Sequence, residues 1–189
     1  MKYDIPAVLF AGGKSSRMGK DKTLLPFANC TTLSEFQYSR LNKYFKEVYL
    51  LAKEDKFDFT VPVITDNYPQ SSPLVGLVSM FESLNADKFF VLSVDAPFVN
   101  EKVIASLLAY NKKYDAVIAK GPNGIEPLCG VYRRSILPLA KKNLEVGDHR
   151  LNNLLKEADT QFIVFEDASV FTNLNHPHEY EDALKRITP

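Results

Sequence analysis

The chain has 189 residues, of which 46% are hydrophobic, and its 23 basic and 23 acidic residues leave no formal net charge. This length and apolar content predict a single globular domain spanning residues 1–189, with enough apolar side chains for a substantial core. The balanced charge gives no reason to expect nucleic acid or a membrane surface as a partner, so any anion must bind at a local cluster of charge.

The first predicted element is a short buried strand at residues 8–10, which runs directly into Ala11, Gly12 and Gly13. These small residues lack the bulk that would keep a ligand away from the backbone N–H groups. A charged residue and a proline precede the strand, and the glycine pair follows it. Neither a signal peptide nor a membrane span is therefore predicted, and we expect a cytoplasmic protein.

Cationic side chains follow the glycine pair: Lys14, Arg17, Lys20 and Lys22, with only Asp21 as an acid among them. A polyanion bound at this loop would be surrounded by positive charge, so we expect a nucleotide here. The alternative is a solvated loop with surface lysines. That alternative is strongest for Lys14 and Lys20.

Two familiar phosphate-binding motifs do not fit this loop. A P-loop that ends at residues 19–20 requires Gly at position 14 and Ser or Thr at position 21, where the chain has Lys14 and Asp21. The dinucleotide fingerprint requires glycines separated by one residue, whereas Gly12 and Gly13 are adjacent. The loop therefore belongs to another class of nucleotide site.

Beyond the loop, the apolar pattern predicts an alternation of helices and strands. Thr32 and Glu35 have the spacing of a capping box at the start of a helix over about 33–45. Turn-forming residues at 67–73 precede a second helix, and Asn100 caps a third. The expected strands are 48–51, 61–65, 88–94, 114–119 and 162–165, with an extended segment at 127–132, and the expected later helices are 74–84, 103–108, one from near Ser135, one capped by Asp148 that carries 151–155, and one from Pro177.

This alternation predicts an α/β fold with three layers, in which helices cover both faces of a mostly parallel sheet. The less regular second half leaves room for one antiparallel strand. In such a sheet, ligands gather beyond the carboxyl ends of the strands. Three predicted strands end at Gly12, Asp66 and Asp95, so one crevice is expected to receive all three.

Asp95 ends the most apolar strand of the chain, residues 88–94. From spacing alone, a carboxylate at this position is a turn or helix cap. If phosphates lie on the glycine loop, the same carboxylate faces them and a magnesium ion would relieve the repulsion, because Mg²⁺ commonly uses one or two protein carboxylates together with phosphates and water. Asp66 has a similar structural alternative, an Asx-turn that opens the loop at 67–73.

The cysteines and two of the histidines give no sign of a metal centre. Cys30 and Cys129 are the only cysteines, and their separation argues against a disulfide framework or a zinc site. We expect buried or incidental thiols. His176 and His178 have no Cys or third His nearby, so we expect surface or capping roles for them.

The glycine loop as a whole resembles the signature of the nucleotidyltransferases that include molybdenum cofactor guanylyltransferase. Two positions elsewhere depart from the family pattern, since Ser72 stands where Gly is usual and His176 where Thr is usual. The first departure weakens any expectation of a backbone contact at position 72. The matching residues are Leu9-Phe10-Ala11-Gly12-Gly13, Ser15, Arg17-Met18-Gly19 and Asp21-Lys22, with thinner matches at 66, 74–77, 95–98, 127–128 and 173–177.

The resemblance implies a role for each site residue. It implies catalysis by Lys22, Asp95 and Arg17, and magnesium binding by Asp95. Asn173 and Asn175 alternate onto one side of an extended chain and are expected to bind the acceptor, although a turn ahead of the last helix explains them about equally well. The expected nucleotide-binding residues are Leu9, Ala11, Gly12, Gly13, Lys22, Asp66 and Asp95.

The activity implied by the resemblance is transfer of GMP from GTP to the terminal phosphate of molybdopterin, giving the guanine dinucleotide form of the cofactor and pyrophosphate. The implied cofactor is Mg²⁺. The implied partners are GTP, molybdopterin or the molybdenum cofactor, and proteins that deliver the cofactor or chaperone molybdoenzymes.

Two other functions stay open. A molybdopterin cytidylyltransferase or a sugar-1-phosphate nucleotidyltransferase is the nearest alternative, and a non-catalytic nucleotide-binding regulator is the alternative from another class. Gly12 favours guanylyl transfer, because the cytidylyl relatives resemble Ala-Ala-Gly at 11–13 and a glycine leaves more room beside a purine. Lys22 together with Asp95 favours catalysis over binding alone.

Overall fold

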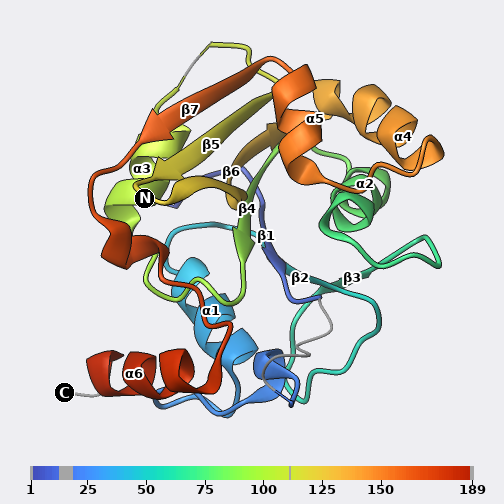
Figure 1. Cartoon of the computed structure of the whole chain (residues 1–189). Coiled ribbons are helices and arrows are strands. Elements are labelled where there is room, and N and C mark those ends of the chain that lie inside the picture. The colour runs from blue at the N-terminus through green and yellow to red at the C-terminus, as the bar shows by residue number, and fades with distance from the viewer. Residues whose placement is uncertain (1, 13–18, 111, 188–189) are drawn as a thin grey trace.

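The computed structural model describes residues 2–12, 19–110 and 112–187 of the chain. Through this part runs one seven-stranded sheet in the order β3-β2-β1-β4-β6-β5-β7 (Figure 1). β6 lies antiparallel to both of its neighbours, and every other pairing is parallel. The expected mostly parallel α/β fold is confirmed. The strands are β1 (Ala7–Phe10), β2 (Val48–Ala52), β3 (Val63–Thr65), β4 (Lys88–Ser93), β5 (Ala116–Gly121), β6 (Gly124–Arg133) and β7 (Thr160–Val164).

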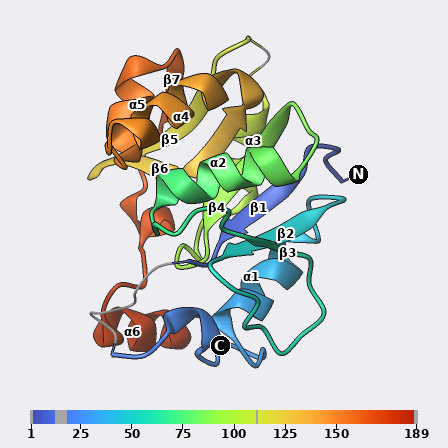
Figure 2. The ribbon, with the colours of Figure 1, turned by 90° about the vertical axis from the view of Figure 1, so that its right-hand side faces the viewer.

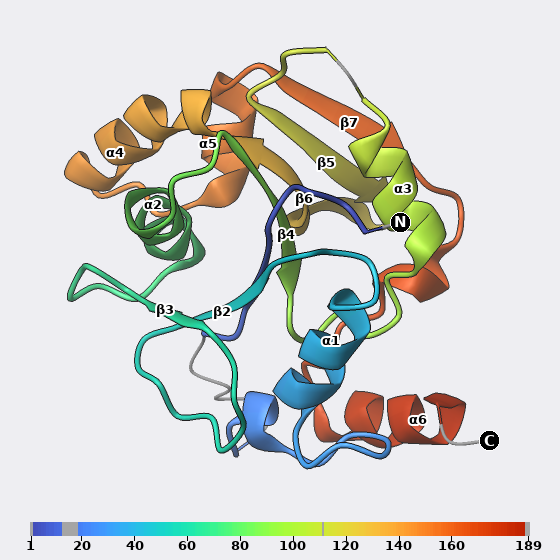
Figure 3. The ribbon, with the colours of Figure 1, turned by 180° about the vertical axis from the view of Figure 1, so that it is seen from behind.

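Helices lie on both sides of the sheet and complete the three layers. One side carries α1 (Leu33–Leu41), α3 (Glu101–Leu108) and α6 (Pro177–Ile187), and the other carries α2 (Pro73–Ser83), α4 (Leu137–Glu145) and α5 (Leu151–Glu157). The turned views in Figures 2 and 3 show the same grouping, with α6 beside α1. In the described part of the chain, no helix has the length and apolar content to cross a membrane.

Buried side chains alternate along the central strand. On β1, Ala7 and Leu9 belong to the core under α1, α3 and α6, whereas Val8 and Phe10 belong to the core under α2, α4 and α5. All four are at most 5% exposed. A strand that is covered on both faces must be apolar at every position, which explains the uninterrupted apolar run in the sequence.

Side-chain caps begin two helices where the sequence predicts them. The hydroxyl of Thr32 accepts a hydrogen bond from the N–H of Glu35 (3.0 Å) at the start of α1. The side chain of Asn100 accepts one from the N–H of Val103 (3.2 Å) at the start of α3. In the expected capping box, Glu35 would accept from the N–H of Thr32. Its carboxylate instead accepts from the N–H of the preceding residue, Thr31 (2.8 Å). Each cap satisfies a backbone donor that the helix itself leaves unpaired.

Two elements are shorter than the sequence predicts. α1 ends at Leu41 rather than near residue 45, because the backbone around Tyr44 pairs with the N-terminal segment: the N–H of Tyr3 donates to the oxygen of Tyr44 (2.7 Å). β3 begins at Val63 rather than at residue 61, and Pro62, which has no N–H for the ladder, directly precedes it.

The predicted starts of several later elements are also corrected, and β5 begins at Ala116 rather than at residue 114. α5 has Arg150 at its N-cap position, and Asp148 instead accepts from the N–H of Arg150 (3.1 Å) and the side chain of Asn153 (2.7 Å). α4 begins at Leu137, after a 3-10 turn that contains the predicted start at Ser135. β7 spans 160–164 rather than 162–165, because its pairing with β5 begins at residue 160.

Candidate active site

The carboxyl ends of β1, β3 and β4 lie at one edge of the sheet. Gly12 lies two residues beyond β1, Asp66 follows β3 directly and Asp95 lies two residues beyond β4. Sheet-like hydrogen bonds continue past β1 and β4 as far as Ala11 and Val94. The three positions therefore share one edge, as the strand ends predicted.

Lys22 and Asp95 form an ion pair at this edge, and each side chain is only 15% exposed. The ammonium of Lys22 also donates to the backbone oxygen of Leu174 (3.1 Å) and to Oδ1 of Asn175 (3.3 Å). The second carboxylate oxygen of Asp95 accepts from the hydroxyl of Ser93 (2.5 Å). A compact positive charge is thus held where three chain segments meet, and such a charge can follow a phosphate through its reaction.

A short 3-10 helix, Lys22–Leu24, holds Lys22 in place. Asp21 caps this helix, because it accepts from both the N–H (3.0 Å) and the hydroxyl (2.7 Å) of Thr23, and it also pairs with Lys56. Burial raises the pKa of Asp21, but the hydrogen bonds from Lys56 and Thr23 outweigh burial and leave the pKa below its ordinary value. The acid inside the cationic loop therefore has a structural role.

A segment from the far end of the chain crosses the same edge. The N–H of Leu174 donates to the backbone oxygen of Asp95 (2.9 Å), and the N–H of Asn175 donates to the carboxylate of Glu179 in the first turn of α6 (2.7 Å). The segment is therefore tied both to the extension of β4 and to the last helix. This anchoring decides where the two asparagines lie.

The two asparagines have different surroundings. The amide of Asn175 contacts Lys22, whereas Asn173 lines a neighbouring cavity. Lys22 is expected to bind the nucleotide and both asparagines the acceptor, yet Asn175 lies against Lys22. Distance along the chain misleads here, because folding returns residue 175 to residue 22. The roles of these residues toward nucleotide and acceptor remain predictions.

A cavity of about 500 Å³ opens beside Asp95, between β6, the start of α5 and the C-terminal segment. Its size is typical of small-ligand sites, which are mostly apolar with a few polar groups. The polar side chains in its wall include Ser93, Asp95, Glu126, His149, Arg150 and Asn173, and the apolar ones include Val99, Leu128, Leu151 and Phe171.

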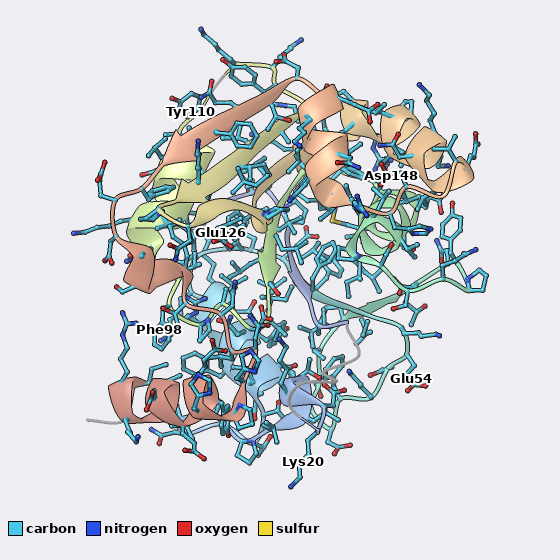
Figure 4. All side chains as sticks on the ribbon, viewed as in Figure 1. Lys20, Glu54, Phe98, Tyr110, Glu126 and Asp148 are labelled. Atoms are coloured by element: carbon cyan, nitrogen blue, oxygen red, sulfur yellow. The ribbon has the colours of Figure 1, made fainter. Side chains whose placement is uncertain are left out.

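Glu126 is a polar cavity residue that strand-end spacing does not reveal, because it lies near the start of β6 (Figure 4). Burial raises the pKa of Glu126, hydrogen bonding by Asn173 lowers it, and the charge of Asp95 raises it further. The available sequence signal is the adjacent Pro127, since proline inside an extended run marks an edge or a bulge.

The departure from the family pattern at Ser72 has a structural explanation. Its hydroxyl accepts from the N–H of Val75 (3.2 Å) at the start of α2 and contacts Nδ1 of His149 (2.9 Å). Ser72 therefore joins α2 to the connection between α4 and α5 at the wall of the cavity.

Asp66 lies farther along the edge, beyond the outer strand β3. Burial raises the pKa of Asp66, and the positive charge of Lys53 lowers it by less, so the pKa stays above its ordinary value. The Oδ1 atom of Asp66 is buried without a hydrogen-bond partner among the described residues. A carboxylate oxygen of this kind suits a donor from a ligand.

Lys20 is exposed and points away from the molecule (Figure 4), which favours the solvent-facing alternative. Gly13 and Arg17, two of the predicted site residues, and Lys14 lie outside the described residues.

The carboxylate of Asp95 suits a magnesium ion that is shared with a nucleotide. In the part of the chain that the structure describes, no group of three or more His, Cys, Asp or Glu side chains could hold a metal. Magnesium bound to phosphates needs only one or two protein carboxylates and keeps several waters. Asp95 can supply one such carboxylate, and the phosphates of the nucleotide would supply further oxygen ligands.

The chemistry available at this edge is positioning and neutralisation of charge. A phosphate oxygen is already a competent nucleophile when it is held in line with a phosphorus atom, so no activated Ser or Cys is needed. An open α/β sheet with these groups at its carboxyl edge defines an enzyme of the nucleotide-transferring class.

The chain belongs to the MobA-like NTP transferase family, whose domain it matches over residues 7–161. The expected family and the expected class of enzyme, a nucleotidyltransferase, are both confirmed.

Two relatives match nearly the whole chain. The molybdenum cofactor guanylyltransferase of Campylobacter jejuni is 39% identical over 187 residues, which cover 97% of each chain. The molybdenum cofactor guanylyltransferase of Helicobacter pylori is 33% identical over 188 residues, covering 96% of this chain and 89% of the relative. The crystal structure of molybdopterin-guanine dinucleotide biosynthesis protein A from Archaeoglobus fulgidus has a TM-score of 0.81 over 96% of this chain and 98% of that chain, and at 18% identity it supports the fold alone.

Proposed function

We propose that this chain transfers GMP from GTP to the terminal phosphate of molybdopterin, with Mg²⁺ as its metal and in the cytoplasm. The observation that carries the proposal is the position of the Lys22–Asp95 pair, between the glycine end of β1 and the cavity beside β6. Relatives at 39% and 33% identity that bear the name guanylyltransferase support the choice of donor and acceptor. The proposal includes, as protein partners, those that deliver the cofactor and those that chaperone molybdoenzymes.

The proposed reaction places the α-phosphate of GTP beside Asp95. An oxygen of the molybdopterin phosphate forms a bond to the α-phosphorus from the cavity side, and the bond from that phosphorus to the β-phosphate oxygen breaks. Lys22 stabilises the charge that develops on the departing pyrophosphate. Magnesium, when bound at Asp95, supplies further neutralisation of the phosphates.

A turnover assay tests the proposal. Pyrophosphate release should require both GTP and molybdopterin, and kcat/KM should be larger for GTP than for CTP or ATP, because discrimination is a difference between transition-state affinities. Equal use of CTP would assign the chain to cytidylyl transfer. Nucleotide binding without turnover would overturn the proposed reaction.

A further inference from the structure

β6 carries an irregularity directly at the cavity. Ile118 of β5 pairs with Gly130, but the next residue, Ala119, pairs with Glu126, so the three residues 127–129 have no partner on β5. All three line the cavity. The hydroxyl of Tyr132 donates to the backbone oxygen of Pro127 (2.6 Å) and fixes the irregular segment. Bulges next to active sites commonly redirect a side chain.

Glu126 directly precedes the irregular segment and brings a charged group into the cavity wall. Leu128, Leu151 and Phe171 also line this cavity, and Asn173 stands beside Glu126. A carboxylate in such surroundings accepts hydrogen bonds only and is costly to bury unless a ligand or neighbour supplies donors. The pocket therefore suits a flat, largely apolar ring that carries two N–H groups along one edge.

The order of the strands places this pocket on the acceptor side. β4, which leads to Asp95, lies between β1 and β6. If the nucleotide occupies the glycine end of β1, the acceptor must approach Asp95 from the β6 side, where Glu126 lies.

We infer that Glu126 recognises the 2-amino-4-oxopyrimidine edge of the pterin in the acceptor, and this inference rests on the proposed function. The ring N3–H and one N–H of the 2-amino group are parallel donors, and they match the two oxygens of a carboxylate as the fork of an arginine does. Guanine presents the same pair of donors, so the experiment must distinguish the pterin from the nucleobase.

The test uses 6-hydroxymethylpterin phosphate and its lumazine analogue, in which oxygen replaces the 2-amino group. Along the same edge, lumazine offers the N3–H donor and the 2-oxo acceptor, a pair that a carboxylate cannot match but an amide can. The wild-type chain should bind the pterin at least about tenfold more tightly than the lumazine, as measured by fluorescence titration. Glu126→Gln should abolish or reverse that preference, while Glu157→Gln, a change at an exposed position on α5, should preserve it.

The nucleotide is the second arm of the experiment. The ratio of GTP to ITP affinity, which reports recognition of the guanine 2-amino group, should be the same in the wild-type and Glu126→Gln chains. Thermal unfolding of both chains, together with their GTP affinity, checks that the variant is folded.

Each remaining outcome overturns a particular statement. An unchanged pterin preference in folded Glu126→Gln, or a shift in the GTP to ITP ratio instead, overturns the inference but leaves guanylyl transfer intact. A wild-type chain that shows no pterin preference also overturns it. Failure of the wild-type chain to release pyrophosphate from GTP with molybdopterin overturns the proposed function itself.

Discussion

The two halves of the sheet build the two sides of the site in different ways. In the parallel half, β3-β2-β1-β4, the strands all end at the same edge, and Gly12, Asp66 and Asp95 lie there because each follows a strand. In the other half, β6 runs in the opposite direction, so the start of that strand brings Glu126 to the edge. A site of this kind therefore draws residues from the ends of parallel strands and from the beginning of an antiparallel one.

The largest effect is expected from a change at Asp95, which lies where the parallel half of the sheet meets β6. Asp95→Asn removes a charge that pairs with Lys22 and that can bind magnesium, while it keeps the shape of the side chain. We expect kcat to fall about a thousandfold, corresponding to roughly 4 kcal/mol in the transition state. Single-turnover kinetics over a range of magnesium concentrations measures the loss. Normal turnover of a folded variant would remove Asp95 from the metal role.

Removal of the Lys22 side chain should affect the part of the site that is expected to bind the nucleotide. We expect Lys22→Ala to lower kcat/KM for GTP about a hundredfold, because the departing pyrophosphate loses its counter-charge. The exposed Lys20 offers a matched control, and Lys20→Ala should change the same constant by less than about twofold. Equal losses in the two variants would show that the loop acts only through its overall charge.

The two asparagines sharpen the comparison because they have different neighbours, Lys22 for Asn175 and the cavity for Asn173. Asn175→Ala removes a contact to Lys22, so we expect the KM for GTP to rise about tenfold. Asn173→Ala alters the cavity wall beside Glu126, so the KM for molybdopterin should rise by a similar factor and that for GTP should not. The opposite pattern would exchange the assignments of the two residues.

Two glycines separate a loss of function from a loss of stability. A Cβ at Gly130 would lie 2.4 Å from the backbone oxygen of Val117 and 2.6 Å from Cδ1 of Ile118, whereas one at Gly12 meets no described atom within 4 Å. Gly130→Ala should therefore lower the free energy of unfolding by about 1–3 kcal/mol. Gly12→Ala should leave stability unchanged and lower kcat/KM for GTP by crowding the purine. Denaturant unfolding and steady-state kinetics on both variants check the contrast.

The smallest expected effect concerns Asp66, the acid farthest from the cavity along the edge. Its folded pKa is raised by burial above the ordinary 3.8, so the folded chain binds this proton more tightly than the unfolded chain does. Stability is then lost as pH rises from about that ordinary value through the folded pKa. Asp66→Asn should remove this loss, which makes the variant at least as stable as the wild type at neutral pH, while GTP affinity falls. Thermal unfolding at several pH values measures the stability. A clear loss of stability at neutral pH would instead indicate a structural role for the carboxylate.

The parts of the structure that follow local rules could be predicted from the sequence. The apolar runs located every strand of the parallel half, and the spacing of Thr32 and Asn100 located two caps, because both depend on neighbouring residues. The contact between Lys22 and Asn175 depends on how distant segments meet, so no local pattern contains it. Glu126 was not predicted, because the rule for strand ends assumes parallel strands.

The hydrogen bonds from Lys22 to Leu174 and Asn175 have a consequence for how the protein becomes active during synthesis. Residue pairs that are 152 and 153 positions apart cannot meet until nearly the whole sheet is assembled, and contacts of such long separation form late in folding. A nascent chain on the ribosome that already carries the glycine loop and Asp95 still lacks Leu174 and Asn175, two further partners that hold the lysine. Nucleotide transfer is thereby delayed until translation has passed Asn175.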